Sequence, residues 1–255
     1  MMRRGMIGAL VLCGIAVSWG WSASSVEKSQ EAAVAPDVTV DRVLDRYIQA
    51  CGGREALERV TSRVSRGTVE IPAAGVRGTF ESYAQAPNRV LVVVELPGFG
   101  AIHEGFDGAV AWAKDPIMGL REKSGRELAA TRLDADFYRP LRLKELYPKI
   151  AVKGKGTVSG TEVYVLEATS AEGSAERWYF DASTGLLVRL DVEREGPQGK
   201  IPVEVYFEDY REVDGLRIPF TIRQVTPAFS LIFKTEEVKH NVAIESGKFA
   251  KPAAQ

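Results

Sequence analysis

The chain has 255 residues, carries a formal charge of -1, and consists of 45% hydrophobic and 26% charged residues. This length supports one large domain or two small ones, and the apolar content is sufficient for a real core. A mean hydropathy of -0.10 excludes a polytopic membrane protein, a disordered chain and a collagen-like fibre. The charge balance argues against a nucleic-acid-binding protein, which would carry an excess of basic residues.

Residues 1–24 have the pattern of a secretory signal peptide. Arg3 and Arg4 form a basic start, residues 7–17 form an apolar run that is short for a membrane span, and small residues follow at 22–25. The sequence therefore predicts export to the periplasm of a bacterial envelope. The alternative is an uncleaved N-terminal anchor.

Cleavage near Ser24 would leave a linker, residues 25–38, and one domain, residues 39–252. Cys13 is not expected to carry a lipid, because the residue before it is leucine and a lipobox needs a small residue there. Cleavage also removes two arginines and one of the two cysteines, so the mature chain would carry a net charge of -3 and Cys51 alone. Since one cysteine cannot form an internal disulfide, the core must stabilise the fold.

Helical patterns precede the strands. Apolar residues recur at three- and four-residue steps after Thr39, a good N-cap: Val40, Val43, Leu44, Tyr47 and Ile48. Cys51-Gly52-Gly53 ends this helix, and residues 54–60 form one or two further turns. Cys51 is expected to be a small buried residue at the end of the helix.

From residue 63 onward, turn signals recur roughly every ten to fifteen residues, with alternating apolar and polar residues between them. Residues 188–193 and 203–208 show this alternation clearly. The pattern predicts an antiparallel meander of about eleven strands with one apolar face.

A second helical segment interrupts the strands between Ser124 and Tyr147. Ser124 and Glu127 have the spacing of a capping box, and Pro140 is expected to kink or divide the helix. Its apolar residues, the predicted lid, are Leu128, Leu133, Phe137 and Leu141. Because a sheet with one apolar face needs a cover, the sequence predicts a mainly β fold, a curved half-barrel with helices over its concave face.

Several motifs occur in a characteristic order. Gly105-Phe106-Asp107-Gly108 is followed by Trp112 and by Asp115-Pro116. This arrangement resembles the D-G-x-x-x-W…P hairpin of the periplasmic lipoprotein carriers of the LolA/LolB type. Further motifs fit that family or resemble its outer-membrane lipoprotein-sorting-like branch: Pro87-Asn88, Tyr179-Phe180-Asp181, Thr184-Gly185-Leu186-Leu187, Asp209-Tyr210-Arg211, Asp214-Gly215-Leu216, Pro219-Phe220, Phe249 and Pro252.

The resemblance, which covers roughly residues 40–252, implies a half-open barrel closed by helices that carries acylated lipoproteins without a cofactor. One position departs from the family. There, an arginine immediately before the Pro-Asn pair fastens the lid, and this chain has Ala86; Arg89 is out of register with it. The resemblance therefore implies a lid that opens more readily here.

The sequence offers no constellation for catalysis or metal binding. Alternation puts His103 and Glu104 on opposite faces of a strand, and His240 lies near the C-terminus without an evident partner. The S-x-x-K match at residues 25–28 lies in the linker, and the glycines at 154–156 precede no helix that would hold a phosphate. We therefore expect no enzymatic activity, no cofactor and no metal ion.

The apolar face offers more large side chains than two short helices can cover, which suggests a cavity for an acyl chain. Trp112 is expected either to close one end of this surface or to anchor the core. The predicted lining is Val90, Val92, Val94, Leu96, Trp112, Leu186, Val188, Leu190, Val203, Val205, Phe207, Ile218, Phe220, Ile222, Phe229, Leu231 and Phe233.

The sequence is compatible with two functions. The first is a monomeric carrier of lipoprotein acyl chains or another long apolar ligand, with envelope proteins as donor and acceptor and transient contact with a membrane. The second is an envelope interaction or assembly module that has the same fold and a filled core. Nucleic acid is not an expected partner of either.

Overall fold

The computed structural model describes residues 38–196 and 199–253. The predicted signal peptide and all but the last residue of the predicted linker lie outside the described residues. Two helices open the described chain, α1 (Val40–Ala50) and α2 (Arg54–Arg59). The first run of strands is β1 (Ser62–Ile71), β2 (Val76–Gln85), β3 (Arg89–Leu96), β4 (Gly100–Phe106), β5 (Ala111–Asp115) and β6 (Gly119–Glu122).

Helices α3 (Gly125–Ala135) and α4 (Arg139–Leu146) follow β6. The second run of strands is β7 (Lys149–Val158), β8 (Thr161–Thr169), β9 (Ala175–Asp181), β10 (Leu187–Gly196), β11 (Gly199–Val213), β12 (Leu216–Val225) and β13 (Ser230–His240). Two short 3-10 helices complete the structure, η1 (Pro72–Ala74) and η2 (Ser246–Phe249).

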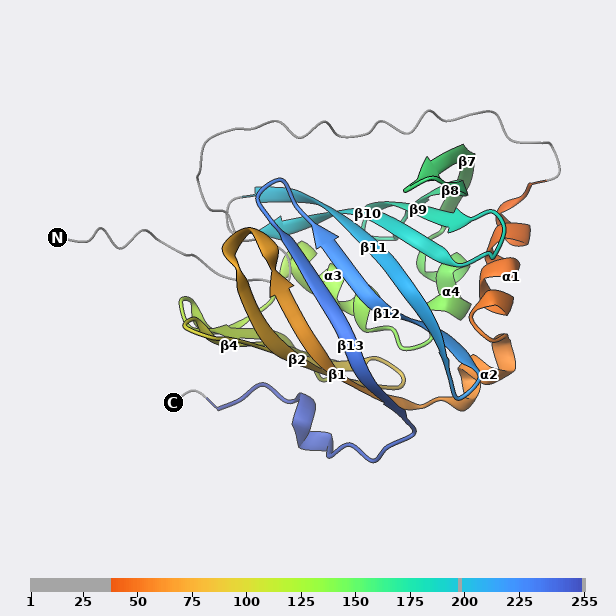
Figure 1. The fold of residues 1–255 in the computed structure, drawn as a ribbon. Coiled ribbons are helices and arrows are strands. Elements are labelled where there is room, and N and C mark those ends of the chain that lie inside the picture. The colour runs from red at the N-terminus through yellow and green to blue at the C-terminus, as the bar shows by residue number, and fades with distance from the viewer. Residues whose placement is uncertain (1–37, 197–198, 254–255) are drawn as a thin grey trace.

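All thirteen strands form one antiparallel sheet in the order β6-β5-β4-β3-β2-β1-β13-β12-β11-β10-β9-β8-β7. Strands β1 and β13 therefore pair in the middle, and the edge strands β6 and β7 are joined along the chain by α3 and α4. Figure 1 shows the sheet curling around these two helices, with α1 along one side. The predicted curved half-barrel is confirmed, with thirteen strands where the sequence suggested about eleven.

The helix starts follow the sequence signals only in part. Thr39 caps α1, since its hydroxyl accepts a hydrogen bond of 3.2 Å from the amide of Arg42. The prediction of a capping box at Ser124 is wrong, because the Ser124 side chain makes no capping hydrogen bond. Glu127 instead pairs with Arg121 through two contacts of 2.7 Å. Pro140 divides the helical segment as expected, because it occupies the first turn of α4, where its missing N–H costs nothing.

Alternation along the strands gives the sheet two faces. The face on which α1, α3 and α4 pack is called the inner face. A first cluster on it joins these helices to β8–β11: Val43, Leu44, Leu133, Leu143, Tyr147, Leu166, Ala168, Trp178, Phe180, Leu190, Val192, Val203 and Val205. A second cluster consists of strand residues only: Val69, Ile71, Phe80, Val94, Leu96, Ile102, Leu231 and Phe233. Half-buried Ile222 packs against both clusters.

The outer face is covered near β3–β5 by the C-terminal segment. Phe249 of η2 is fully buried there with Leu91 and Trp112. The indole nitrogen of Trp112 donates to the carbonyl of Phe249 at 2.9 Å, and the ring lies against Gly105, where a Cβ would approach it within 2.5 Å. Gly105 therefore makes room for the tryptophan that the sequence motif places on the neighbouring strand.

Candidate functional site

Most of the predicted lining residues share the inner face. The first cluster contains Leu190, Val203 and Val205, and half-buried Phe207 packs against it. The second contains Val94, Leu96, Leu231 and Phe233, and half-buried Val92 and Phe229 pack against it. Val90 packs with Leu128 of α3, and Ile218 packs with Phe137. Alternation in the sequence therefore identified a surface that the fold does assemble.

Four predicted lining residues do not belong to the clusters of the inner face. Trp112 lies on the outer face under η2 and is a core anchor there. Val188 packs on the outer face with Tyr179, because the register of β9 and β10 shifts between Leu187 and Arg189. Leu186 lies buried in the turn before β10, and Phe220 is buried beneath the guanidinium of Arg211, 4.5 Å from its ring centre.

A buried polar network fastens α4 to the sheet. Glu176 on β9 lies among the first cluster with its side chain 1% exposed, and its carboxylate accepts from Arg139, Tyr147 and Trp178, each at 2.7 Å. Burial opposes the charge of Arg139, but Glu176 holds the pKa of this guanidinium above its usual range. Burial also raises the pKa of Tyr147, which therefore stays a neutral donor.

The N-terminal part of the lid is held less firmly. Residues Arg126 to Thr131 of α3 are exposed or half-buried, and only Leu133 and Ala135 are fully buried. Besides the Arg121–Glu127 pair, Arg126 contacts Glu195 of β10 at 3.2 Å, with its own side chain 67% exposed. Exposed pairs of this kind contribute about 0–1 kcal/mol.

Residue 86, where the resemblance implies a lid-fastening arginine, is alanine in this chain. Ala86 has no group that could fasten the lid, but the carbonyl of the next residue, Pro87, accepts a 2.9 Å hydrogen bond from the amide of Phe137. Phe137 lies in the link between α3 and α4, and the guanidinium of Arg63 lies over its ring at 5.9 Å from the centroid. The link is thus attached through its backbone, and no arginine at residue 86 takes part.

Small side chains occupy the middle of the inner face. Ser65 pairs across the strands with Ser82, and Ser82 pairs with Val92; likewise Ala84 pairs with Val90. These five residues, called the central floor, are all half-buried, and Val90 among them packs with Leu128 of α3. Short side chains that keep accessible surface leave room on this face for a ligand.

Arg63 lies at one end of the central floor. It is the direct partner of Ala84 on β2 and of His240 on β13. Its Nε donates to Nε2 of His240 at 3.2 Å, and Nδ1 of that ring lies 2.9 Å from the carboxylate of Asp214. Burial lowers the pKa of Arg63, and the residue as a whole is half-buried.

Helix α1 completes the surroundings of Arg63. Tyr47 and Cys51 from the end of α1 interact electrostatically with it, and the hydroxyl of Tyr210 donates to the carbonyl of Leu187 at 2.7 Å nearby. Burial raises the pKa of both tyrosines and raises that of Cys51 to about 11. These groups are therefore neutral at neutral pH.

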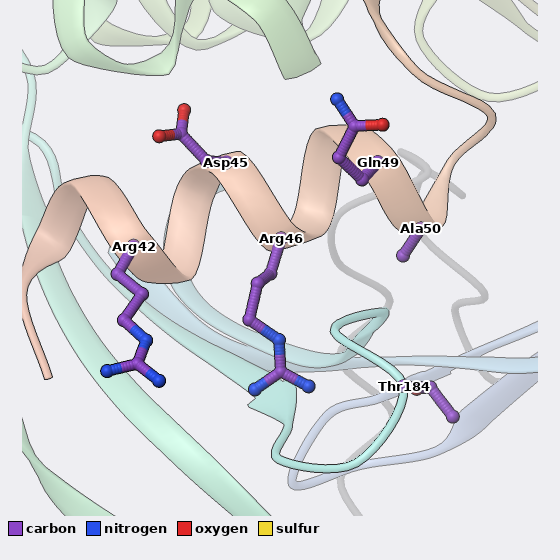
Figure 2. A pocket seen from close by; sticks show the side chains of 6 residues that line it. All are labelled: Arg42, Asp45, Arg46, Gln49, Ala50 and Thr184. Carbon is purple, nitrogen blue, oxygen red and sulfur yellow. The ribbon is translucent and has the colours of Figure 1, made fainter.

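Two hollows of the surface lie away from the predicted lining. One, of about 550 Å³, lies beside α1 and is lined by Arg42, Asp45, Arg46, Gln49, Ala50 and Thr184. Figure 2 shows Arg46 pointing toward the turn that carries Thr184 and Arg42 on the same side of the helix, whereas Asp45 and Gln49 point to the other side. Arg46 donates to the carbonyl of Ser183 at 3.0 Å, so it fastens this turn to α1.

The other hollow, also of about 550 Å³, lies at the ends of β1–β4 and includes Thr68, Thr79 and Glu95. Only Leu96 of the predicted lining contributes to it. No group of three or more potential metal ligands occurs within residues 38–196 and 199–253, and no helix in these ranges is both long and apolar enough to cross a membrane.

Apolar periodicity does not reveal the polar groups of this site. Arg63 shares its alternation with Val69 and Ile71, and Glu176 shares its alternation with Trp178 and Phe180. A charged residue that occupies the same face of a strand as buried apolar residues is the sequence signal that could have identified Arg63 and Glu176. His240 was expected to have no partner, but the structure brings it to Arg63 and Asp214.

No family model and no curated protein matches the sequence. Among solved structures, the fold is similar to a DUF1329 family protein from Desulfovibrio piger, with 16% identity, a TM-score of 0.57, and coverage of 83% of this chain and 97% of that one. It is also similar to a LolA superfamily protein from Nitrosomonas europaea, with 12% identity, a TM-score of 0.56, and coverage of 84% and 98%.

A third similar structure is a domain from Vibrio parahaemolyticus described as an outer membrane lipoprotein-sorting protein, with 12% identity, a TM-score of 0.50, and coverage of 82% and 97%. Identities this low show a common fold alone. The curled antiparallel sheet, its helical cover and these three likenesses agree: the chain has a LolA-like fold.

Proposed function

We propose that the protein is a non-catalytic carrier or binding protein for lipoprotein acyl chains or another long apolar ligand. The single observation that carries this proposal is the central floor, where small, half-buried side chains line the inner face beside α3. The LolA-like fold supports it, because one solved relative in fold is described as a lipoprotein-sorting domain. The predicted signal peptide supports a periplasmic location, with donor and acceptor proteins in the envelope.

The energetics of such binding are adequate without any catalytic group. Burying an acyl chain gains about 0.8 kcal/mol per methylene, so ten methylenes give about 8 kcal/mol before entropy losses. The apolar walls for this chain would be the half-buried residues around the floor, among them Phe207 and Ile222. A monomer suffices for this function.

Neighbouring residues on β3 allow a matched test. Val92 belongs to the central floor, whereas Val93 packs on the outer face with Trp112 and Phe249 of η2. Both valines are half-buried. The variant V92F should weaken binding of a dansyl-labelled undecanoic acid at least about tenfold, and V93F should leave it unchanged. Fluorescence titration gives the affinities, and urea unfolding gives the stabilities.

The alternative function, an interaction or assembly module with a filled core, predicts the opposite pattern. A filled floor would bind no fatty acid in the unaltered protein. V92F would then lose about 1–3 kcal/mol of stability through overpacking. Either result would reject the carrier.

A further inference from the structure

The guanidinium of Arg63 has unused hydrogen-bonding capacity inside the protein. Its Nε donates to His240, but its two terminal nitrogens make no hydrogen bond with the residues that the structure describes. Among the described residues, the fully occluded side-chain atoms that lack a hydrogen-bond partner are Thr68 Oγ1 and Arg121 Nε. The two terminal nitrogens of Arg63 therefore keep some accessible surface. Accessible space therefore adjoins the donors of a half-buried side chain.

The charge of Arg63 is also unbalanced. Within residues 38–196 and 199–253 no carboxylate lies within ion-pair distance of it, and Asp214 reaches it only through the neutral ring of His240. The carboxylate of Asp214 itself is 65% exposed. A buried cation without a counter-charge destabilises a fold, and an apolar residue of similar volume is generally tolerated better.

A purely structural role for Arg63 does not use these features. The contact with the Phe137 ring, with its centroid 5.9 Å from the guanidinium carbon, is a weak cation–π interaction, and the bond to His240 uses Nε alone. Two terminal nitrogens in a planar fork match the two oxygens of a carboxylate or the oxygens of a phosphate. The missing counter-charge is therefore of a kind that a ligand can supply.

We infer that Arg63 binds the anionic head of an amphiphile whose acyl chain lies over the central floor. This inference rests on the proposed function and narrows it to ligands that end in an oxyanion. Ala84, the cross-strand partner of Arg63, begins the floor, and Ser82 and Val92 continue it toward the second cluster. The head would thus lie under Phe137, and the chain would extend along β2 and β3.

The test compares three ligands of equal chain length: dodecanoate, dodecyl phosphate and dodecan-1-ol. Each displaces Nile red, an uncharged dye, from the full mature chain. In the unaltered protein we expect the two anions to bind about tenfold or more tightly than the alcohol, since hydrogen bonds to charged groups are the strong ones. The ratio between the two anions distinguishes a carboxylate from a phosphate source.

Variants assign any preference to Arg63. R63M should bind all three ligands equally, with the affinity for dodecan-1-ol unchanged, and R63K should retain part of the preference. R66M is the matched control, because Arg66 lies on the outer face of the same strand and pairs with Glu81 and Glu237. It should keep the full preference for the anions.

The outcomes separate the inference from the function beneath it. If the unaltered protein binds the alcohol as tightly as the anions, a carrier is supported and the role of Arg63 is rejected. If R63M keeps the preference for anions, another group recognises the head and the inference is overturned. If none of the three ligands binds, the carrier function itself fails. The ligand comparison needs no variant, so it decides even if R63M does not fold.

Discussion

Arg139 on α4 places its Nη2 2.7 Å from Oε2 of Glu176, whose carboxylate is almost completely buried on β9. The same carboxylate accepts from Tyr147 and from the indole of Trp178, so one buried charge satisfies three donors. Because the donors come from α4, from the residue after it and from the sheet, this network fixes the second half of the lid.

Removal of that carboxylate should be costly. The variant E176A removes the buried carboxylate and leaves Arg139 with Asp134, at 3.2 Å and 42% exposed, as its remaining counter-charge. We expect a loss of about 3 kcal/mol in the free energy of unfolding. Urea unfolding followed by tryptophan fluorescence measures it. Glu172, exposed in the turn before β9, provides the control, and E172A should change stability by less than about 0.5 kcal/mol. A loss below about 1 kcal/mol for E176A would contradict this account of the network.

The lid should open from its N-terminal end. Hydrogen exchange in α3 is expected to be faster than in β8 and β9, and faster than in α4, because most of α3 is exposed or half-buried and its contact with Glu195 of β10 is exposed. E127A, which removes the contacts to Arg121, should increase exchange in α3 further. A bound acyl ligand should slow it. Equal protection of α3 and the strands, unchanged by ligand, would favour the filled-core module.

Stability should fall as the pH decreases through the titration of histidine. Burial lowers the pKa of His240 below its usual value of 6.5; the charge of Arg63 lowers this pKa further, whereas Asp214 raises it. Burial also lowers the pKa of His103. The unfolded chain therefore binds more protons just below pH 6.5, so acid favours unfolding in that interval.

Urea midpoints at about pH 7.5 and about pH 5.5 measure this effect. H240Q keeps a donor for Asp214 and an acceptor for Arg63 but does not titrate, so its midpoint should decline less than that of the unaltered protein. The variant H103Q measures how much of the decrease in the urea midpoint comes from His103. An unchanged slope in the double variant would exclude the histidines as the cause.

Trp112 should hold the C-terminal segment on the outer face. In W112F the carbonyl of Phe249 loses its buried donor, which we expect to cost about 1–3 kcal/mol. Limited proteolysis should then cut near η2 earlier than in the unaltered protein. K251A, which removes only an exposed contact with Glu122, should leave the cleavage rate unchanged.

Cys51 should be unreactive in the folded protein. Burial raises its pKa to about 11, so almost no thiolate exists at neutral pH. In a C13S chain, reaction with a disulfide reagent should therefore follow unfolding, and its rate should rise with denaturant. Rapid modification in native buffer would show that the end of α1 opens on its own.

The apolar periodicities predicted much of this molecule. Thr39 as a cap, the division at Pro140 and the alternation around Val205 each depend on local chemistry, so they could be read from the sequence. The position of Val188 could not be read from the sequence, because a register shift between β9 and β10 places it on the outer face. Trp112 could not either, since the segment that covers it follows more than a hundred residues later.

The polar part of the site was harder to predict for a different reason. Arg63 meets His240, Phe137 and Tyr47 only after four distant segments assemble, and no local pattern encodes that meeting. Alternation does assign Arg63 to the buried side of β1, but it does not reveal which groups face it. Burial of a charge is thus predictable from sequence, whereas its partners are a property of the fold.

The pairing of β1 with β13 has a consequence for how the chain acquires its structure. Arg63 is the register partner of His240, so the two strands at the centre of the sheet are separated by almost the whole domain. Until synthesis or translocation delivers β13, β1 keeps an unpaired edge that can recruit another chain. Contacts of such long range are formed slowly. The incomplete chain therefore depends on being shielded from its own copies, and a truncation before Ser230 should aggregate.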